Sequence, residues 1–352
     1  MTVVHVIFSF GVGGAENLLV DILNQQVEQA RVCLVIINRR YSADILRRID
    51  PRVAVTCLDR AEGNKWNVWP IVRCWRLLRA LRPDVVHCHD HDLMKLLWPW
   101  RSRAVLTAHN VGVPTTFLWR YRRVFAISDA VRLDLAQRGY DTAVIVLNGI
   151  DFGAFAKKTA YATEPAGLQL IQISRLLHEQ KGQDVALRAL HTLVQAPDYA
   201  QTTLTLVGEG PSLAYLQQLT QELGLAERVV FLGVRDRAWV MTNLCTFDVL
   251  VQPSYFEGFG LTVLEGLAAG LPVAATNTDG PAEILRDLPA GGLFEPGDSA
   301  GLAQQLRRFA DLYRCGQLAP AVAASVQSAE RRFSIQATAA NYLRLYPRSG
   351  TV

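Results

Sequence analysis

The chain has 352 residues, half of them hydrophobic, and carries a formal net charge of +4 at pH 7. Its length is typical of two domains or of one large domain, and its apolar content is enough for a sizeable core. No stretch reaches the ~18 uncharged apolar residues that a membrane-spanning helix needs, so we expect no such helix. The six cysteines show no paired spacing, which is typical of reduced thiols, and we therefore expect a cytoplasmic protein.

Charge and tryptophan are distributed unevenly between the two halves of the chain. Residues 1–153 contain 20 Lys and Arg against 14 Asp and Glu, a balance of +6, whereas residues 154–352 contain 16 against 18, a balance of −2. Six of the seven tryptophans lie in the first half, at positions 66, 69, 75, 98, 100 and 119. A basic, tryptophan-rich half joined to a nearly neutral half predicts two parts with different partners.

The first half alternates strand-like and helix-like segments. Apolar strand-like segments are expected at 3–10, 31–38, 53–58, 84–89, 104–110, 123–128 and 143–151. Helical spacing is expected at 17–26, 71–83 and 129–139. The last of these helices should begin at Ser128 or Asp129, which are favoured at helix N-termini, and end at Gly139.

A polar segment at 156–167 interrupts this alternation and is predicted to be a linker. The alternation then restarts, with strands expected at 168–174, 202–211, 228–233, 247–254 and 270–277 and a helix at 182–195. Two successive runs of this kind predict an α/β protein with two doubly wound parallel sheets, whose ligands bind at the carboxyl ends of the strands. We therefore place domains at 1–155 and 165–334, with the C-terminal helical segment 335–352 a candidate to join the first.

A glycine-rich turn, GVGGAE, follows the first strand. A dinucleotide-binding fingerprint would need glycine at its sixth position, where this chain has Glu16, and an acidic residue after the second strand, where it has Asn38. Nicotinamide dinucleotide binding is therefore disfavoured. The glycines predict either a tight turn with positive φ or a loop whose backbone approaches a ligand at the sheet edge.

Two cations lie in the segment that follows the first strand of the second half, ISRLLHEQKGQD. Arg175 and Lys181 stand just before a predicted helix N-terminus, and together they form a good site for a diphosphate. The alternative is a solvated loop with ordinary surface cations.

Two glutamates flank the start of an apolar helix in PSYFEGFGLTVLEGLAAG. We expect this helix to begin near Gly260–Thr262, where free backbone amides favour an anion. Glu257 precedes it and Glu265 lies in its first turns. Carboxylates accept hydrogen bonds from hydroxyl groups, so a sugar or a ribose is the expected guest. A lone glutamate at such a place is usually structural, whereas two of them among glycines are more specific.

Three histidines alternate in HCHDHD, at positions 87, 89 and 91, together with Asp90 and Asp92. They would share one face if a strand continued through them, and would then resemble a metal cluster. The preferred interpretation is the end of a strand entering a ligand site, without a metal.

Basic and tryptophan-rich segments recur in the first half as WNVWPIVRCWRLLRALR, WPWRSR and FLWRYRR. Much of this set could be core, but arginine beside tryptophan is also what an interfacial protein presents to anionic lipid. An anionic membrane surface, on the cytoplasmic face of an inner membrane, is therefore a candidate partner. Nucleic acid is not expected, because no recognition motif accompanies the charge.

Four motifs of the second half appear in one order across residues 170–295: SRLLHEQKG, LVGEGP, RVVFLG and PSYFEGFGLTVLEGLAAGLPVAAT. Together they resemble the retaining glycosyltransferases of family 4, and GVGGAE, TAHN and NGID in the first half agree more loosely. The resemblance implies the GT-B fold, in which two Rossmann-like domains face each other across a cleft and the second holds most of a nucleotide sugar.

The resemblance also implies a role for each candidate residue. Arg175 and Lys181 would contact the donor diphosphate, and Glu257 would bind hydroxyls of the transferred sugar. Glu265 would bind the ribose, and His109 matches a family histidine near the transferred sugar, although Asn110 after it departs from the family pattern. Backbone amides would line the donor at Gly13, Gly14, Gly258, Phe259, Gly260, Leu261 and Thr262.

The resemblance thus predicts transfer of a sugar from a nucleotide sugar, with UDP as the expected nucleotide, to a saccharide or lipid-linked saccharide of a surface glycan such as lipopolysaccharide core, capsule or exopolysaccharide. It implies retention of anomeric configuration without a covalent nucleophile, a metal or another cofactor. One alternative is a nucleotide-sugar epimerase of the same architecture. Another is a non-catalytic partner subunit, against which the presence of both cations and both glutamates argues.

Overall fold

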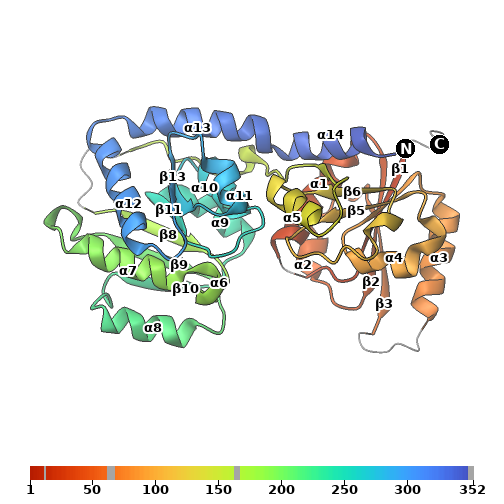
Figure 1. Ribbon diagram of the computed structural model, residues 1–352, viewed down its shortest axis with the longest axis horizontal. Coiled ribbons are helices and arrows are strands. Elements are labelled where there is room, and N and C mark those ends of the chain that lie inside the picture. The colour runs from red at the N-terminus through yellow and green to blue at the C-terminus, as the bar shows by residue number, and fades with distance from the viewer. Residues whose placement is uncertain (12, 62–67, 162–166, 348–352) are drawn as a thin grey trace. The chain divides into compact units, whose positions relative to one another are not determined.

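The computed structural model describes residues 1–11, 13–61, 68–161 and 167–347. The chain divides into two compact units (Figure 1). Unit 1 comprises Met1–Ile150 and Phe333–Val352, and unit 2 comprises Asp151–Arg332.

Unit 1 is built on a parallel sheet of seven strands in the order β3-β2-β1-β4-β5-β6-β7. Its strands are β1 (Thr2–Ile7), β2 (Arg31–Asn38), β3 (Ala54–Arg60), β4 (Val85–Cys88), β5 (Ala104–Ala108), β6 (Arg123–Ala126) and β7 (Val144–Ile145). The central strands are nearly continuous runs of buried residues, as expected where helices cover both faces of a parallel sheet.

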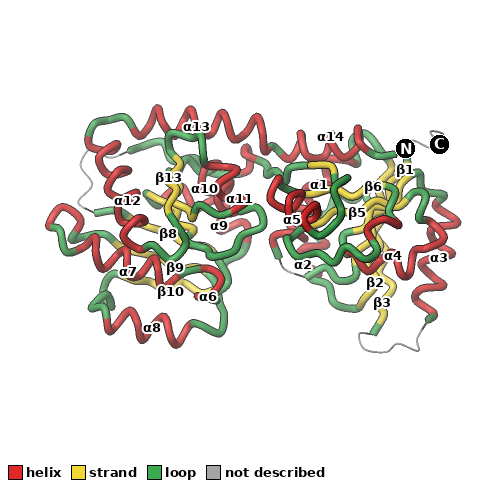
Figure 2. Tube along the Cα trace, in the orientation of Figure 1, coloured by secondary structure: helices red, strands yellow, loops and turns green. Residues whose placement is uncertain are grey.

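The helices of unit 1 alternate with these strands (Figure 2). They are α1 (Gly14–Gln26), α2 (Ala43–Leu46), α3 (Trp69–Leu81), α4 (Met94–Leu97), α5 (Asp129–Gln137) and α14 (Ile335–Leu345), with short 3₁₀ turns η1 (His91–Leu93), η2 (Trp98–Trp100) and η3 (Leu118–Arg120). The predicted start of α5 is confirmed, because the Ser128 hydroxyl accepts a hydrogen bond from the Val131 amide.

Unit 2 repeats the plan with six parallel strands in the order β10-β9-β8-β11-β12-β13. These are β8 (Gln169–Ile173), β9 (Thr203–Val207), β10 (Val229–Gly233), β11 (Val249–Gln252), β12 (Val273–Thr276) and β13 (Gly291–Phe294). The helices are α6 (His178–Lys181), α7 (Gln183–Val194), α8 (Leu213–Glu222), α9 (Arg237–Asn243), α10 (Leu261–Ala268), α11 (Asp279–Leu285), α12 (Ser299–Arg314) and α13 (Leu318–Phe333), with 3₁₀ turns η4 (Phe152–Ala154), η5 (Pro197–Tyr199) and η6 (Leu244–Thr246). The predicted pair of doubly wound parallel sheets is confirmed.

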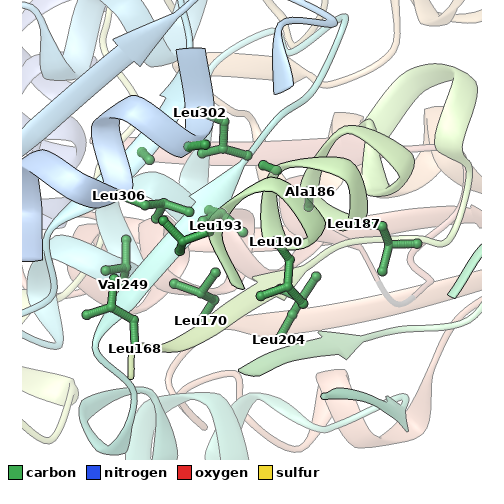
Figure 3. Close-up of a cluster of buried hydrophobic side chains, with 14 of the residues drawn as sticks. Leu168, Leu170, Ala186, Leu187, Leu190, Leu193, Leu204, Val249, Leu302 and Leu306 are labelled. Atoms are coloured by element: carbon green, nitrogen blue, oxygen red, sulfur yellow. The ribbon is translucent and has the colours of Figure 1, made fainter. Parts of the chain in front are cut away.

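The core of unit 2 forms where α7 and α12 meet the sheet. Leu187, Leu190 and Leu193 of α7 lie against Leu170 and other apolar strand residues (Figure 3). Burying each such side chain stabilises the unit by about 1.5–3 kcal/mol. This core fixes the ends of β8 and β11, from which the candidate site is built.

The polar segment predicted to be a linker begins as part of unit 2. The Ala156 amide donates to the Met241 carbonyl, and the Lys158 ammonium lies 3.0 Å from an Asp248 carboxylate oxygen. The Tyr161 hydroxyl donates to the Gly270 carbonyl at 2.7 Å. The described part of this segment, 156–161, is therefore fixed to unit 2 by polar contacts, and residues 162–166 lie outside the described residues.

The C-terminal helix α14 belongs to unit 1. The Ile335 amide donates to the Ile150 carbonyl, and the Thr338 hydroxyl donates to the Leu147 carbonyl at 2.8 Å. Two tyrosines near its end, Tyr342 and Tyr346, are buried in unit 1. None of the helices in the described ranges combines the length and the apolar character that crossing a membrane requires.

Candidate active site

In unit 2, the order of the sheet reverses between β8 and β11, which are neighbours. Loops after two such strands diverge from the same sheet edge, and ligands of open α/β sheets bind there. The segment after β8 carries Arg175 and continues into α6, whose last residue is Lys181. The loop after β11 carries Glu257. The fold therefore brings the segment with Arg175 and Lys181 to the same sheet edge as the loop with Glu257, although the two lie far apart in the sequence.

Lys181 and Glu257 form an ion pair at this edge. The Lys181 Nζ atom donates to Glu257 Oε2 at 2.7 Å, and the two side chains are only 18% and 19% exposed. A partly buried pair of this kind is strongly coupled, because removal of one partner leaves the other charge poorly solvated. Lys181 keeps two further N–H donors and Glu257 keeps a second oxygen for a ligand.

Buried glutamines donate hydrogen bonds to both loops. The Gln252 amide donates to Glu257 Oε2 at 3.2 Å and to the Ser254 hydroxyl at 3.0 Å. The Gln172 amide donates to the Lys181 carbonyl at 2.8 Å, and the Gln183 amide donates to the Arg175 carbonyl at 2.9 Å. Each loop is thus fixed by a permanently neutral group that pH does not alter.

The two loops also touch through their backbones at Gly182. This glycine has φ +62°, and a Cβ atom there would lie 1.9 Å from the Pro253 carbonyl oxygen. Beside it the Tyr255 amide donates to the Gln180 carbonyl at 2.8 Å. The contact leaves no room for a side chain, so it sets the distance between the loop with the cations and the loop with Glu257.

Helix α10 begins where the sequence predicts it. Gly260 is its N-cap, with φ +96°, and Leu261 is its first residue. The first amides of a helix have no acceptor within the helix, and the helix dipole favours an anion in front of them. Glu265 is half-buried one turn further on. Cations, helix amides and carboxylates therefore occupy adjoining segments at this sheet edge.

Of the two alternatives for the glycine turn of unit 1, the tight turn with positive φ is wrong, and the approach of its backbone to a ligand stays a prediction. Gly11, Gly13 and Gly14 are not among the glycines with positive φ, and Gly13 is extended, with φ −163°. A Cβ atom at Gly13 would instead lie 2.3 Å from a carboxylate oxygen of Glu16. That oxygen is the end of a flexible side chain, which can move, so neither φ nor a fixed contact requires glycine at position 13.

The predicted histidine cluster is also revised. Strand β4 ends at Cys88, so alternation stops there, and His91 lies on η1, where its Nε2 atom is 3.5 Å from an Asp92 oxygen. His5 of β1 takes its place beside His87 and His89, because β1 and β4 are paired. Sequence reasoning missed His5, since nothing local links it to a residue 84 positions away.

His109 lies at the end of this cluster. Its Nε2 atom is 3.1 Å from His89 Nδ1, and His89 Nε2 is 2.9 Å from His5 Nδ1. Burial lowers the pKa of His5 and of His109 to about 4, and it lowers the pKa of His87 and of His89 well below the ordinary value. All four rings are therefore neutral at pH 7.

Donor atoms of His5, His87 and His89 lie within 4.8 Å of one another, as three metal ligands could. However, each ring nitrogen of these three residues has a hydrogen-bond partner. A metal ion would have to displace these bonds, so the geometry favours a hydrogen-bonded network.

Comparison with known proteins identifies the family. Residues 12–153 match the family described as "Glycosyltransferase Family 4", and residues 167–311 match "Glycosyl transferases group 1". A phosphatidyl-myo-inositol mannosyltransferase of Mycobacterium leprae is 30% identical over 287 residues, which cover 76% of this chain and 74% of the relative. The chain belongs to glycosyltransferase family 4.

Two further comparisons cover nearly the whole of this family 4 glycosyltransferase. The lipopolysaccharide core biosynthesis glycosyltransferase LpsD of Rhizobium meliloti is 26% identical over 374 residues, or 99% of this chain and 98% of the relative. The structure of Anabaena Alr3699/HepE in complex with UDP and glucose has a TM-score of 0.78 at 20% identity, and the match covers 97% and 98% of the two chains. The predicted family and GT-B fold are confirmed, and the chain is a glycosyltransferase.

The residues that position the site of this glycosyltransferase lie outside its sequence motifs. Gln172 and Gln252 are buried polar residues inside apolar strands. That position is a usable signal, because a buried amide needs partners, and the amide nitrogens of both residues donate to the two site loops, whereas their oxygens have no hydrogen-bond partner among the described residues. The roles predicted for Arg175, Lys181, Glu257, Glu265, His109 and the backbone amides stay predictions.

Proposed function

We propose that this glycosyltransferase moves a hexosyl group from a nucleotide-sugar donor, with UDP as the nucleotide, to a saccharide or lipid-linked saccharide of a surface glycan, with retention of anomeric configuration. The observation that carries the proposal is the Lys181–Glu257 ion pair, 2.7 Å across, at the switch point of unit 2. It places a cation and a hydroxyl acceptor side by side, as a sugar diphosphate requires.

The donor diphosphate is the part of the substrate that needs positive charge. Cleavage of the bond from the anomeric carbon to the diphosphate adds negative charge to the leaving group. Arg175, Lys181 and the first amides of α10 would stabilise that charge, and one preorganised donor of this kind contributes about 2.7–4 kcal/mol to the transition state. We propose that these groups act without a metal ion.

The carboxylates would bind the hydroxyl groups on either side of the diphosphate. Glu257 has an oxygen available for the transferred sugar, and Glu265 would accept from the ribose. The acceptor would attack from the face that the diphosphate leaves, and a departing phosphate oxygen would take its proton. The carbon–oxygen bond to the diphosphate breaks as the new glycosidic bond forms, without a covalent enzyme intermediate.

The relatives support the substrate classes in this proposal. LpsD is named for lipopolysaccharide core biosynthesis, and the HepE structure contains UDP and glucose. Relatives named as transferases do not favour the epimerase or the non-catalytic subunit. His109, Gly13 and Gly14 belong to unit 1, and we propose that they contribute to donor binding as the family resemblance implies.

The first experiment is a thermal-shift comparison with UDP, GDP, ADP and NAD. A ligand at a hundred times its dissociation constant stabilises the folded state by ~2.7 kcal/mol. We expect a shift with UDP that Lys181→Ala loses and Arg307→Ala keeps, since Arg307 is an exposed cation on α12. A shift with GDP or ADP in place of UDP would change the proposed nucleotide, and a shift with NAD alone would overturn the proposal.

We also propose that an aromatic and basic cluster of unit 1 contacts an anionic membrane. Trp119 is 67% exposed and Trp98 is 40% exposed. The Arg120 guanidinium lies 4.6 Å from the Trp98 ring and 4.8 Å from the Trp119 ring, and Arg101 lies 4.5 Å from the Trp98 ring. Exposed indoles held beside arginines suit the interfacial region of a bilayer. A lipid-linked acceptor would be met at the same surface.

A further inference from the structure

One buried amide is placed to decide how the histidines of unit 1 carry their protons. Gln26, at the end of α1, is completely buried. Its Oε1 atom is 2.8 Å from His5 Nε2, and its Nε2 atom is 3.1 Å from the Tyr346 hydroxyl. An amide oxygen can only accept and an amide nitrogen can only donate, so this residue gives a direction to the bonds on either side of it.

The Gln26 amide first determines which ring nitrogen of His5 carries the hydrogen. Because Gln26 Oε1 accepts, the hydrogen must be on His5 Nε2. His5 is buried and neutral at pH 7, so its Nδ1 atom carries a lone pair. That lone pair faces His89 Nε2 at 2.9 Å, and His89 must therefore carry its hydrogen on Nε2.

The same step repeats at His89 and His109. With its hydrogen on Nε2, neutral His89 accepts through Nδ1, which lies 3.1 Å from His109 Nε2. His109 consequently donates through Nε2 and, being neutral, has a lone pair on Nδ1. Within the described ranges, no hydrogen bond engages His109 Nδ1, and the ring is only partly buried.

We propose that Gln26 is a positioning residue that acts through His5 and His89 to hold His109 in the tautomer protonated at Nε2. His109 Nδ1 is then a fixed hydrogen-bond acceptor for a substrate hydroxyl group rather than a donor to a phosphate or carbonyl oxygen. This inference rests on the proposed function for the identity of the ligand but not for the tautomer itself. It gives a role to three buried polar residues, Gln26, His5 and His89, which no step of sugar transfer uses directly.

The other side of the amide provides an internal check. Tyr346 accepts from Gln26 Nε2, so its own O–H donates to His87 Nδ1 at 2.8 Å. His87 Nε2 then donates to the Thr107 hydroxyl at 2.7 Å, which donates to the Tyr342 hydroxyl at 3.1 Å. Each of these four hydrogen bonds joins one donor to one acceptor. The branch does not touch His109, so it supplies a matched control.

The test is the tautomer of His109 in the full-length protein labelled with ¹⁵N-histidine. Long-range ¹H–¹⁵N spectra distinguish a ring nitrogen that bears hydrogen from one that does not, and loss of a signal set in His109→Gln assigns the ring. We expect a single neutral tautomer with hydrogen on Nε2. A ring protonated on Nδ1 would mean that the Gln26 amide is reversed, and it would overturn the proposal.

Variants of the network show whether Gln26 sets this tautomer. Gln26→Leu removes the acceptor for His5, and we expect the His109 signals to become a mixture of both tautomers. Gln26→Glu places a carboxylate in front of His5 and favours the protonated ring, whose Nδ1 then donates to His89 Nε2. We therefore expect the hydrogen of His109 to move to Nδ1, and this reversal tests the proposal if the leucine variant does not fold. Tyr346→Phe cuts only the other branch and should leave His109 unchanged. An unchanged His109 tautomer in a folded Gln26→Leu protein would show that Gln26 does not act through His5 and His89, and would overturn this relay of hydrogen bonds.

Kinetics separates the relay from the proposed function. Loss of one oriented hydrogen bond to the substrate should lower kcat about ten-fold in Gln26→Leu and in Gln26→Glu, with no change in Tyr346→Phe. If the tautomer is lost while kcat is unchanged, the relay stands and the role of His109 in the proposed function fails.

Discussion

The sheets of both units reverse their order between the first strand and the fourth, at β1 beside β4 in unit 1 and at β8 beside β11 in unit 2. In unit 2 the loops at this place carry formal charges, with Lys181 paired to Glu257 over neutral glutamines. In unit 1 the same place holds neutral imidazoles joined through Gln26. The same topology therefore supports two kinds of polar site. One is a fixed ion pair, and the other is a hydrogen-bonded network whose donors and acceptors depend on which ring nitrogens carry hydrogen.

This difference predicts which kind of change disrupts the charge pair of unit 2 and which disrupts the histidine network of unit 1. A charge pair fails when one partner is removed, because the remaining charge is left partly buried. A network of neutral rings is disrupted when the rings gain protons, because burial disfavours the charged form and so lowers the pKa of every ring. Substitutions should therefore dominate the response of unit 2, and pH should dominate the response of unit 1.

The largest effect should come from Lys181→Ala. It removes a cation from the leaving-group site and leaves Glu257 without its partner, so we expect kcat to fall about 10²–10³-fold. Steady-state transfer assays beside circular dichroism would measure this, with Arg307→Ala as the control for loss of an exposed positive charge in unit 2. Near-normal turnover in a folded Lys181→Ala protein would remove Lys181 from the mechanism.

The contact between the two loops of unit 2 should show the next largest effect. Gly182→Ala places a methyl group against the Pro253 carbonyl, and we expect a loss of about 3 kcal/mol in the free energy of unfolding. Gly224→Ala is the matched control, because Gly224 has a similar φ of +68° but no atom within 4 Å of an added Cβ. Denaturant titration of both variants isolates the steric contact, and equal losses would show that backbone conformation alone matters.

Much of this site could be predicted from sequence because its parts are local. The start of α10, the cations after β8 and the glutamates after β11 each lie in one short motif, and apolar strands with intervening helices indicate two parallel sheets. The histidine network could not be predicted in this way. Its members are joined by β1–β4 pairing and by the return of α14, across separations of 84 and 259 residues. Strand β13 was missed because GGLF is short and half glycine.

Membrane binding extends the comparison to the surface of unit 1. Arg101→Ser with Arg120→Ser removes both arginines that stack on Trp98, and each basic residue near an anionic bilayer contributes about 1 kcal/mol. We expect the vesicle partition coefficient to fall more than ten-fold in co-sedimentation with anionic vesicles. Arg123 is not a suitable target, because its guanidinium donates to the Leu345 carbonyl within unit 1.

The control for this experiment is Arg47→Ser with Arg52→Ser, which removes the same charge from exposed ion pairs elsewhere in unit 1. Equal losses in the two double variants would show that binding follows net charge rather than the aromatic cluster. No loss in either would reject membrane binding through this surface.

The smallest effect at neutral pH should come from a single histidine, because its contribution to acid stability appears only below its pKa in the unfolded chain. His109 has a pKa of about 4 in the folded protein and about 6.5 when unfolded, so the unfolded chain binds one more proton between these values. Stability is therefore complete above pH 6.5 and falls as the pH drops towards 4, by up to about 1.4 kcal/mol per pH unit for one full proton. His109→Gln should reduce the proton uptake on unfolding by about one at pH 5, measured from denaturant unfolding at closely spaced pH values. An unchanged pH slope would mean that burial does not hold the ring of His109 neutral. The contrast between a charged site in unit 2 and a neutral network in unit 1 would then fail at the one ring of that network for which we propose a contact with substrate.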